Sequence, residues 1–88
     1  MDNRLLLVED DASLIDALAY SLKKNGFTLE IARSVQEAYA LLSASSFDLL
    51  LLDITLPDGN GYQVCERIRA EGNQVPVIFL TALDEEVN

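Results

Sequence analysis

The 88-residue chain contains no histidine and only one cysteine, Cys65. The lack of histidine excludes histidine-based catalysis and histidine metal ligands, and a single cysteine cannot form a disulfide within the chain. Cys65 lies in a helical pattern, where we expect half-buried packing rather than a nucleophile. Long hydrophobic runs are also missing. The run at 5–8, close to the N-terminus, is too short for a signal peptide or a membrane span, so a cytoplasmic protein is expected.

Positive charge is scarce as well. Six lysines and arginines stand against fifteen aspartates and glutamates, which gives a formal net charge of −9. Direct binding to nucleic acid or to an acidic membrane needs a basic face, and neither is expected of this chain. The acidity could simply keep the chain soluble, or it could reflect carboxylates gathered in one site. Half of the residues are hydrophobic, which is too many for a disordered chain, and the length allows one domain with a small core.

Strand-like and helix-like patterns alternate along the chain, and no repeat, low-complexity stretch or linker interrupts them. Strands are predicted at about 4–9, 28–32, 49–53 and 75–80, and helices at about 12–25, from 35 past 42, and from the loop at 56–61 to about 71. This alternation predicts an α/β fold with a doubly wound parallel sheet. The strand at 49–53 is the most apolar and is expected to be central, whereas the alternating pattern at 28–32 fits an edge strand.

Capping residues mark the predicted helix boundaries. Asp11 is placed to cap the first helix, and Gly26 to end it. Ser34 and Glu37 have the spacing of a capping box at the start of the second helix. Gly72 is expected to end the third helix.

Three of the predicted strands end in residues that can carry chemistry. The first runs into Glu9, Asp10 and Asp11, the third ends at Asp53, and the fourth runs into Thr81. The C-terminal strand ends of an open parallel sheet share one edge, where ligands bind, so these side chains are expected to meet. Taken singly, each has an ordinary explanation as a helix cap, a surface residue, a loop entry or a turn residue. Only their joint placement favours a site.

The expected pocket suits Mg²⁺ and a phosphoryl group. Mg²⁺ prefers oxygen ligands at roughly 2.0–2.1 Å and usually keeps waters beside one or two carboxylates. Asp10 and Asp53 could supply these carboxylates, and the backbone carbonyl of Thr55 could complete the protein ligands. Clustered carboxylates raise one another's pKa, and a bound cation reverses this effect. Asp53 could also attack phosphorus to give an acyl phosphate, with Thr81 donating a hydrogen bond to a phosphoryl oxygen.

The segments 6–11, 48–62 and 76–82 together resemble the response-regulator receiver family of two-component signalling. The resemblance runs over the whole chain, with the motifs in the family's order. Its most specific motif is an aspartate after a hydrophobic strand, with proline four residues on and glycine eight residues on. The resemblance implies the flavodoxin-like receiver topology.

The resemblance also implies a role for each residue of the pocket. Asp53 would be the phosphoacceptor and a Mg²⁺ ligand, Asp10 a second direct ligand, and Glu9 a ligand through water. The backbone carbonyl of Thr55 would be the third protein ligand. Thr81 would be the switch hydroxyl that moves toward the phosphoryl group, with Ala82 as the small residue after it. The donor would be a phosphohistidine on a partner sensor histidine kinase.

One departure from the family concerns its second half. A complete receiver continues through a fourth helix, a fifth strand that carries a lysine and the switch aromatic, and a fifth helix. Residues 1–88 are therefore expected to be the N-terminal part of a receiver domain, in which Lys23 and Lys24 lie at the wrong end of the first helix to replace that lysine. The strand at 75–80 would then be an apolar edge, which is expected to promote a dimer.

The sequence leaves three functional interpretations open. The first is a receiver that takes a phosphoryl group onto Asp53 and switches an output domain. The amino-acid sequence at 56–61 resembles that of receivers joined to a winged-helix DNA-binding domain. DNA would be bound only through that missing domain. The second is a truncated receiver that only self-associates, without phosphorylation competence. The third is a phosphatase of the haloacid-dehalogenase type, which is disfavoured because Thr55 stands where that class has an aspartate, so an enzyme is not expected.

Overall fold

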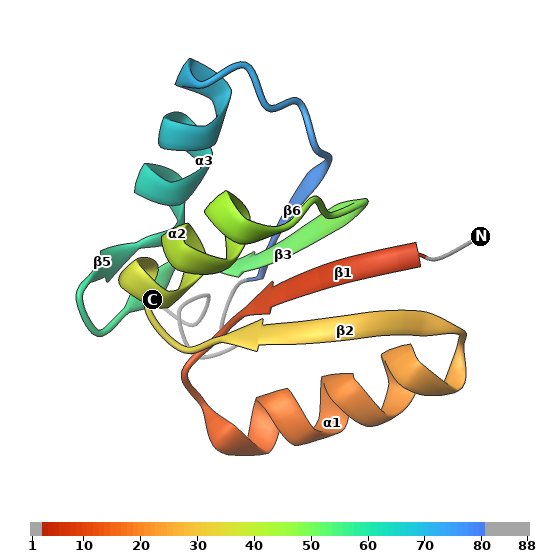
Figure 1. The fold of residues 1–88 in the computed structure, drawn as a ribbon. Helices are drawn as coiled ribbons and strands as arrows, with labels where there is room; N and C mark the ends of the chain where they lie inside the picture. Colours follow the sequence, from red (N-terminus) through yellow and green to blue (C-terminus); the bar gives the residue numbers. More distant parts are fainter. Residues whose placement is uncertain (1–2, 81–88) are drawn as a thin grey trace.

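The computed structural model describes residues 3–80 (Figure 1). Three helices alternate with the strands of a parallel sheet, and a short hairpin lies between the third long strand and the last helix. The elements are β1 (Asn3–Val8), α1 (Ala12–Lys24), β2 (Phe27–Ala32), α2 (Val35–Ala44), β3 (Leu49–Asp53), β4 (Thr55–Leu56), β5 (Gly59–Asn60), α3 (Gly61–Ala70) and β6 (Val77–Leu80).

The main sheet has the strand order β2-β1-β3-β6, and all of its pairs are parallel. The predicted strand at 28–32 is an edge, and the apolar strand at 49–53 lies between two neighbours, as its sequence indicates. The last strand begins at Val77 rather than at Val75, because Pro76 has no N–H for the ladder. The carbonyl of Pro76 still accepts a bond from the Leu50 N–H at 2.9 Å.

The segment predicted only as a turn-rich loop contains two short antiparallel strands. Thr55 pairs with Asn60 and Leu56 with Gly59, which leaves Pro57 and Asp58 at the tip of the hairpin. These residue types favour a tight turn. The side chain of Leu56 is buried, so the hairpin is packed onto the domain.

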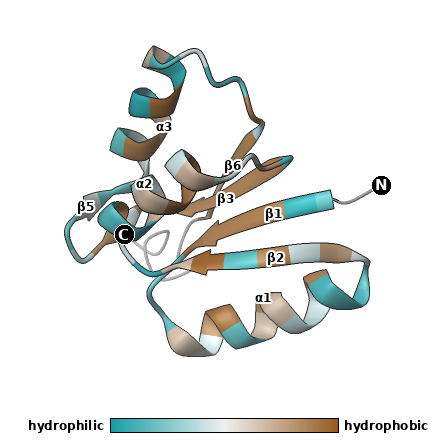
Figure 2. Cartoon of the chain, viewed as in Figure 1, coloured by the Kyte–Doolittle hydropathy of each residue, from teal (hydrophilic) through white to brown (hydrophobic). Residues whose placement is uncertain are grey.

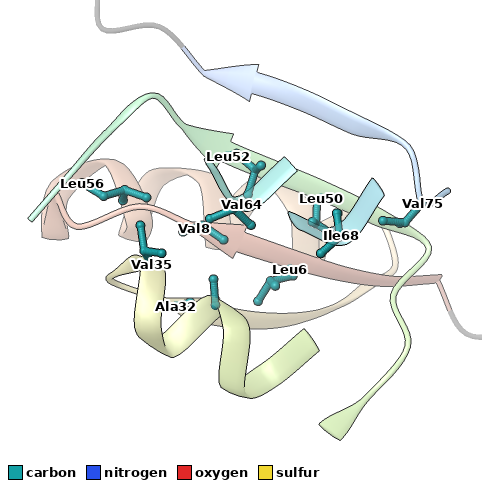
Figure 3. Packing of buried hydrophobic residues seen from close by; sticks show 11 residues of the cluster. Leu6, Val8, Ala32, Val35, Leu50, Leu52, Leu56, Val64, Ile68 and Val75 are labelled. Carbon is teal, nitrogen blue, oxygen red and sulfur yellow. The ribbon is translucent and has the colours of Figure 1, made fainter. Parts of the chain in front are cut away.

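The larger core fills the space between the sheet and the pair α2 and α3 (Figure 3). Alternate residues of a strand point to opposite faces, so Leu6 and Val8 face this core while Leu5 and Leu7 face away from it. Figure 2 shows strongly hydrophobic stretches in β1 and β3, whereas β2 alternates hydrophobic with hydrophilic residues. The larger core consists of Leu6, Val8, Ala32, Val35, Ala38, Leu50, Leu52, Leu56, Val64, Ile68 and Val75.

The opposite face of the sheet is covered by α1 (Figure 1). Ile15 of this helix is buried with Leu5, Leu7 and Leu51. Coverage decreases toward β6, where Ile78 is 51% exposed. The structure thus confirms, for residues 3–80, the doubly wound α/β arrangement with helices on both faces. No helix in this range is long and apolar enough to span a bilayer.

The start of α1 is capped as predicted. The Asp11 carboxylate accepts hydrogen bonds from the N–H groups of Ser13 at 2.9 Å and Leu14 at 3.2 Å. The helix ends before Gly26, whose φ of 93° lies in the left-handed region that glycine adopts without strain. The turn between α1 and β2 therefore follows from local sequence.

The predicted capping box of α2 is only half formed. The Ser34 side chain accepts a bond from the Glu37 N–H at 3.1 Å, but the Glu37 carboxylate accepts from the Arg33 N–H at 2.9 Å instead of from Ser34. A complete capping box is present at α3, between Asn60 and Gln63.

A pair of identical substitutions should separate core from surface in this fold. Ile68 is 2% exposed between α3 and the sheet, whereas Ile78 is 51% exposed on β6. Ile68→Val should lower the free energy of unfolding by about 0.5–1.5 kcal/mol, because it removes a buried methylene group. Ile78→Val should change it by less than about 0.5 kcal/mol. Urea denaturation followed by circular dichroism measures both, and equal effects would contradict the observed packing.

Candidate metal centre

Three carboxylates meet at the C-terminal edge of the main sheet. Glu9 and Asp10 follow β1, and Asp53 ends β3, the strand paired directly with β1. One carboxylate oxygen from each of the three residues lies within 4.8 Å of the other two. The parallel register therefore brings together side chains that are more than forty residues apart in the sequence.

Glu9 is the most enclosed of the three, with 3% of its surface exposed. Its Oε2 accepts hydrogen bonds from the backbone N–H groups of Asp10 and Asp11, each at 3.1 Å. Its own N–H donates to the carbonyl of Ala32 at 2.9 Å, which fixes this residue against β2. Burial raises the pKa of the Glu9 carboxyl, and the charge of Asp53 adds to this effect against the opposing Asp11 N–H.

Asp53 is half-buried and Asp10 is exposed, so the cluster opens to solvent on the Asp10 side. Burial raises the pKa of the Asp53 carboxyl, and the charge of Asp10 raises it further. The neighbouring backbone N–H of Ile54, the Glu9 carboxyl and the N–H of Thr55 act against this rise in pKa. The folded chain therefore holds two carboxyl groups whose ionised forms are unfavourable without a compensating positive charge.

The motif glycine eight residues after Asp53 has a steric role. A Cβ atom at Gly61 would overlap the carbonyl oxygen of Asp53 and also crowd the Leu52 side chain. The Gly61 N–H donates to the carbonyl of Ile54 at 2.9 Å. Glycine thus allows the first turn of α3 to pack directly against the backbone that carries the Asp53 side chain.

The remaining predicted site residues lie in different places. Thr55 is exposed at the start of β4, two residues after Asp53, and the role of its carbonyl as a ligand stays a prediction. Thr81 and Ala82 lie outside the described residues. Lys23 and Lys24 end α1 just before β2 begins, so they are at the opposite edge of the sheet from the carboxylates.

One residue of the hairpin has a contact that sequence reasoning missed. Asp58 lies in the segment predicted as a loop, and its carboxylate accepts hydrogen bonds from the backbone of α2. The local sequence gives no signal for this contact, because its partners precede Asp58 by more than twenty residues. Only the packing of the hairpin beside α2 brings them together.

The donor set fits a hard divalent cation. The cluster offers carboxylate oxygens, which Mg²⁺ prefers, and among the described residues it holds no softer donor. The raised pKa values of Glu9 and Asp53 mean that a cation would relieve an existing electrostatic cost. Because Oε2 of Glu9 already accepts two backbone bonds, that oxygen is less available for direct coordination than those of the other two residues.

Known proteins share both the sequence and the fold. The family described as response regulator receiver domain matches residues 5–88. The swarming motility regulation protein RssB of Serratia marcescens is 49% identical over 80 residues, which is 91% of this chain and 36% of that protein. The chain thus spans about a third of the length of the curated relatives that it matches.

Solved receiver structures superpose closely on the chain. The non-phosphorylated HemR receiver domain from Leptospira biflexa has a TM-score of 0.85 at 40% identity and covers 93% of this chain and 66% of that one. The MaeR response regulator bound to beryllium trifluoride also has a TM-score of 0.85, at 36% identity, over 93% of this chain and 68% of that one. The predicted flavodoxin-like receiver topology is confirmed.

The crowding of carboxylates should make the metal-free fold less stable at neutral pH. The pKa of the Asp53 carboxyl is higher in the folded chain than in the unfolded chain. At a pH between these two pKa values, the folded chain holds the carboxyl proton more tightly than the unfolded chain does. Stability should therefore fall as the pH rises from about 4 through the raised pKa. Asp53→Asn should remove part of this loss and raise the free energy of unfolding at pH 7 by on the order of 1 kcal/mol.

Urea denaturation with a chelator at pH 4 and pH 7 tests this expectation. The matched control is Asp48→Asn, which removes the same charge at the opposite edge of the sheet. The Asp48 carboxylate accepts a bond from the Arg4 N–H at 2.8 Å, so this control should destabilise the chain. A loss of stability at pH 7 in Asp53→Asn would contradict the expected electrostatic cost of the three clustered carboxylates.

Proposed function

Because the chain belongs to the response-regulator receiver family, we propose that it accepts a phosphoryl group on Asp53 from a sensor histidine kinase. The observation that carries this proposal is the convergence of Glu9, Asp10 and Asp53 at one edge of the sheet. Phosphorylation would then control an output domain in the parent protein. Receivers are signalling modules, and we propose that role here rather than that of an enzyme, with the cytoplasm as the location.

Asp53 would act as the nucleophile. Its carboxylate oxygen forms a bond to phosphorus while the bond between phosphorus and the donor imidazole nitrogen breaks, and the imidazole, already protonated on its other ring nitrogen, leaves as the neutral base. The product is an acyl phosphate on Asp53. The close approach of Gly61 to the Asp53 carbonyl helps to fix the backbone that carries the attacking side chain. The chain has no histidine, which agrees with a donor on a separate protein.

Mg²⁺ would be held by Asp10 and Asp53 directly, by the Thr55 carbonyl, and by Glu9 through water. When bound, the ion neutralises charge on the carboxylates and on the transferring group. The hydrogen bonds to Oε2 of Glu9 support the indirect role of this residue. Thr81, as the switch hydroxyl, and Ala82 after it belong to the same proposal.

The parent protein would be longer than residues 1–88, which we propose are the N-terminal part of its receiver domain. The curated relatives support this, since the chain matches 36% of each. The MaeR structure carries beryllium trifluoride, a mimic of a phosphoryl group, which supports the same chemistry for this chain. DNA would be bound only by the output domain.

A second candidate function is self-association through β6. This strand is an edge of the sheet formed by residues 3–80, and Ile78 on it is 51% exposed. Pairing of two β6 edges would cover apolar surface and unpaired backbone groups. This function is compatible with the first, because it uses the lateral edge of the sheet along β6, whereas the carboxylates lie at the C-terminal ends of β1 and β3.

Phosphorylation by a small phosphodonor tests the first proposal. The chain incubated with acetyl phosphate and Mg²⁺ should gain one phosphoryl group, detected by intact-mass spectrometry and mapped to Asp53. Asp53→Asn should abolish the modification, because the amide cannot attack phosphorus. Asp10→Asn should reduce Mg²⁺ affinity by about tenfold or more in isothermal titration, whereas Asp48→Asn should leave both properties intact.

The result would contradict the proposal if the modification persisted in Asp53→Asn. A chain that binds no Mg²⁺ would contradict the assigned ligand set. A chain that binds Mg²⁺ equally well with and without Asp10 would contradict the role of that residue alone.

A further inference from the structure

The segment between Asp53 and α3 packs against α2. Leu56 is 6% exposed and lies in the same core as Val35, the first residue of α2. A Cβ atom at Gly59 would overlap the Gln63 side chain and press on that of Val35. The hairpin therefore lies in close contact with the starts of both α2 and α3.

Asp58, at the tip of this hairpin, joins it to α2 through both oxygens of its carboxylate. Oδ1 accepts a hydrogen bond from the Val35 N–H at 2.7 Å, and Oδ2 accepts one from the Gln36 N–H at 3.1 Å. Hydrogen bonds to an ionised acceptor are stronger than neutral ones. The Val35 bond, followed by that of Gln36, lowers the pKa of the Asp58 carboxyl, which favours the ionised acceptor.

These bonds complete the first turn of α2. The first N–H groups of a helix have no partner within the helix and need an external acceptor. The Ser34 side chain accepts only the bond from Glu37, and the N–H groups of Val35 and Gln36 donate to Asp58. The first turn of α2 and the tip of the hairpin thus hold each other in place.

The same hairpin carries the backbone beside the phosphoacceptor. Its base is fixed by the Gly61 N–H bond to Ile54 and by the pairing of Thr55 with Asn60. The base bonds lie within the hairpin and α3, so they do not fix the hairpin relative to α2. Beside the apolar packing of Leu56 with Val35, Asp58 supplies the hydrogen-bonded attachment to α2, across more than twenty residues of sequence.

We propose that Asp58 is a positioning residue for the metal and phosphoryl site. By tying the hairpin to the N-terminus of α2, it holds the Thr55 backbone in place relative to Asp53, and it couples metal binding to the first turn of α2. This inference rests on the proposed function, because it requires Mg²⁺ to bind at Asp53 and Thr55. A cap that merely stabilised α2 would change the free energy of unfolding without changing the affinity for Mg²⁺.

Two properties of the 88-residue chain test this role. Mg²⁺ affinity is measured by isothermal titration, and the amide resonances of Val35 and Gln36 are followed by NMR during the same titration. In the unsubstituted chain, Mg²⁺ should shift both resonances. Asp58→Ala should weaken Mg²⁺ binding by about tenfold, which is typical for the loss of a residue that orients a metal ligand. Asp58→Asn retains one acceptor oxygen and should lose less affinity.

Asp48→Ala is the matched control. The Asp48 carboxylate also accepts a backbone N–H, that of Arg4, but it lies at the opposite edge of the sheet. This substitution removes the same charge and should lower stability while leaving Mg²⁺ affinity unchanged. Repeating the titrations near 1 M salt, where the Debye length is about 3 Å, separates positioning from the simple loss of a nearby charge. The positioning effect should persist.

Each contrary outcome is distinct. Equal Mg²⁺ affinity in the Asp58→Ala and unsubstituted chains would overturn the positioning role and leave the proposed function in place. Unchanged Val35 and Gln36 resonances in the unsubstituted chain at saturating Mg²⁺ would also overturn it, even if the variants failed to fold. Absence of Mg²⁺ binding by the unsubstituted chain would contradict the metal site itself and this inference with it.

Discussion

The parallel pairing of β1 with β3 is the constraint on which the rest of the site depends. It places the ends of two buried strands side by side, so that the carboxylates of Glu9, Asp10 and Asp53 lie close together. The strands are held by apolar packing on both faces, which is strong enough to keep these carboxylates together despite their repulsion. The site is therefore unfavourable by itself and is stabilised by a core that lies elsewhere.

The sequence predicts those features that depend on neighbouring residues or on strand ends. The apolar run at 49–53 defines a buried strand, and Asp11 precedes the helix that it caps. The parallel topology then brings the three carboxylates together. The contact of Asp58 with Val35 could not be predicted, because it depends on how a hairpin packs against a helix that is distant in sequence. The spacing of Ser34 and Glu37 alone does not determine which backbone N–H the Glu37 carboxylate binds, and in the structure it is that of Arg33.

The site combines rigid and adjustable parts. Glu9 is fixed by backbone bonds and burial at the end of β1, whereas the Asp10 side chain is exposed to solvent. Asp53 stands between these extremes, with Gly61 packed against its backbone. The hairpin that follows connects Asp53 to α2, which gives the proposed acceptor a direct structural path to the first turn of a helix.

The order of the strands also bears on how the chain folds as it is synthesised. β1 is made first, yet Leu5 pairs with Leu29 and Leu49, which are made much later. β2 is completed before β3, and at about 5–20 residues per second β1 lacks its β3 partner for seconds. An apolar strand without partners is prone to aggregate. The central position of β1 thus makes early protection of the nascent chain, for instance by a chaperone, more important than it is for a fold built from local pairs.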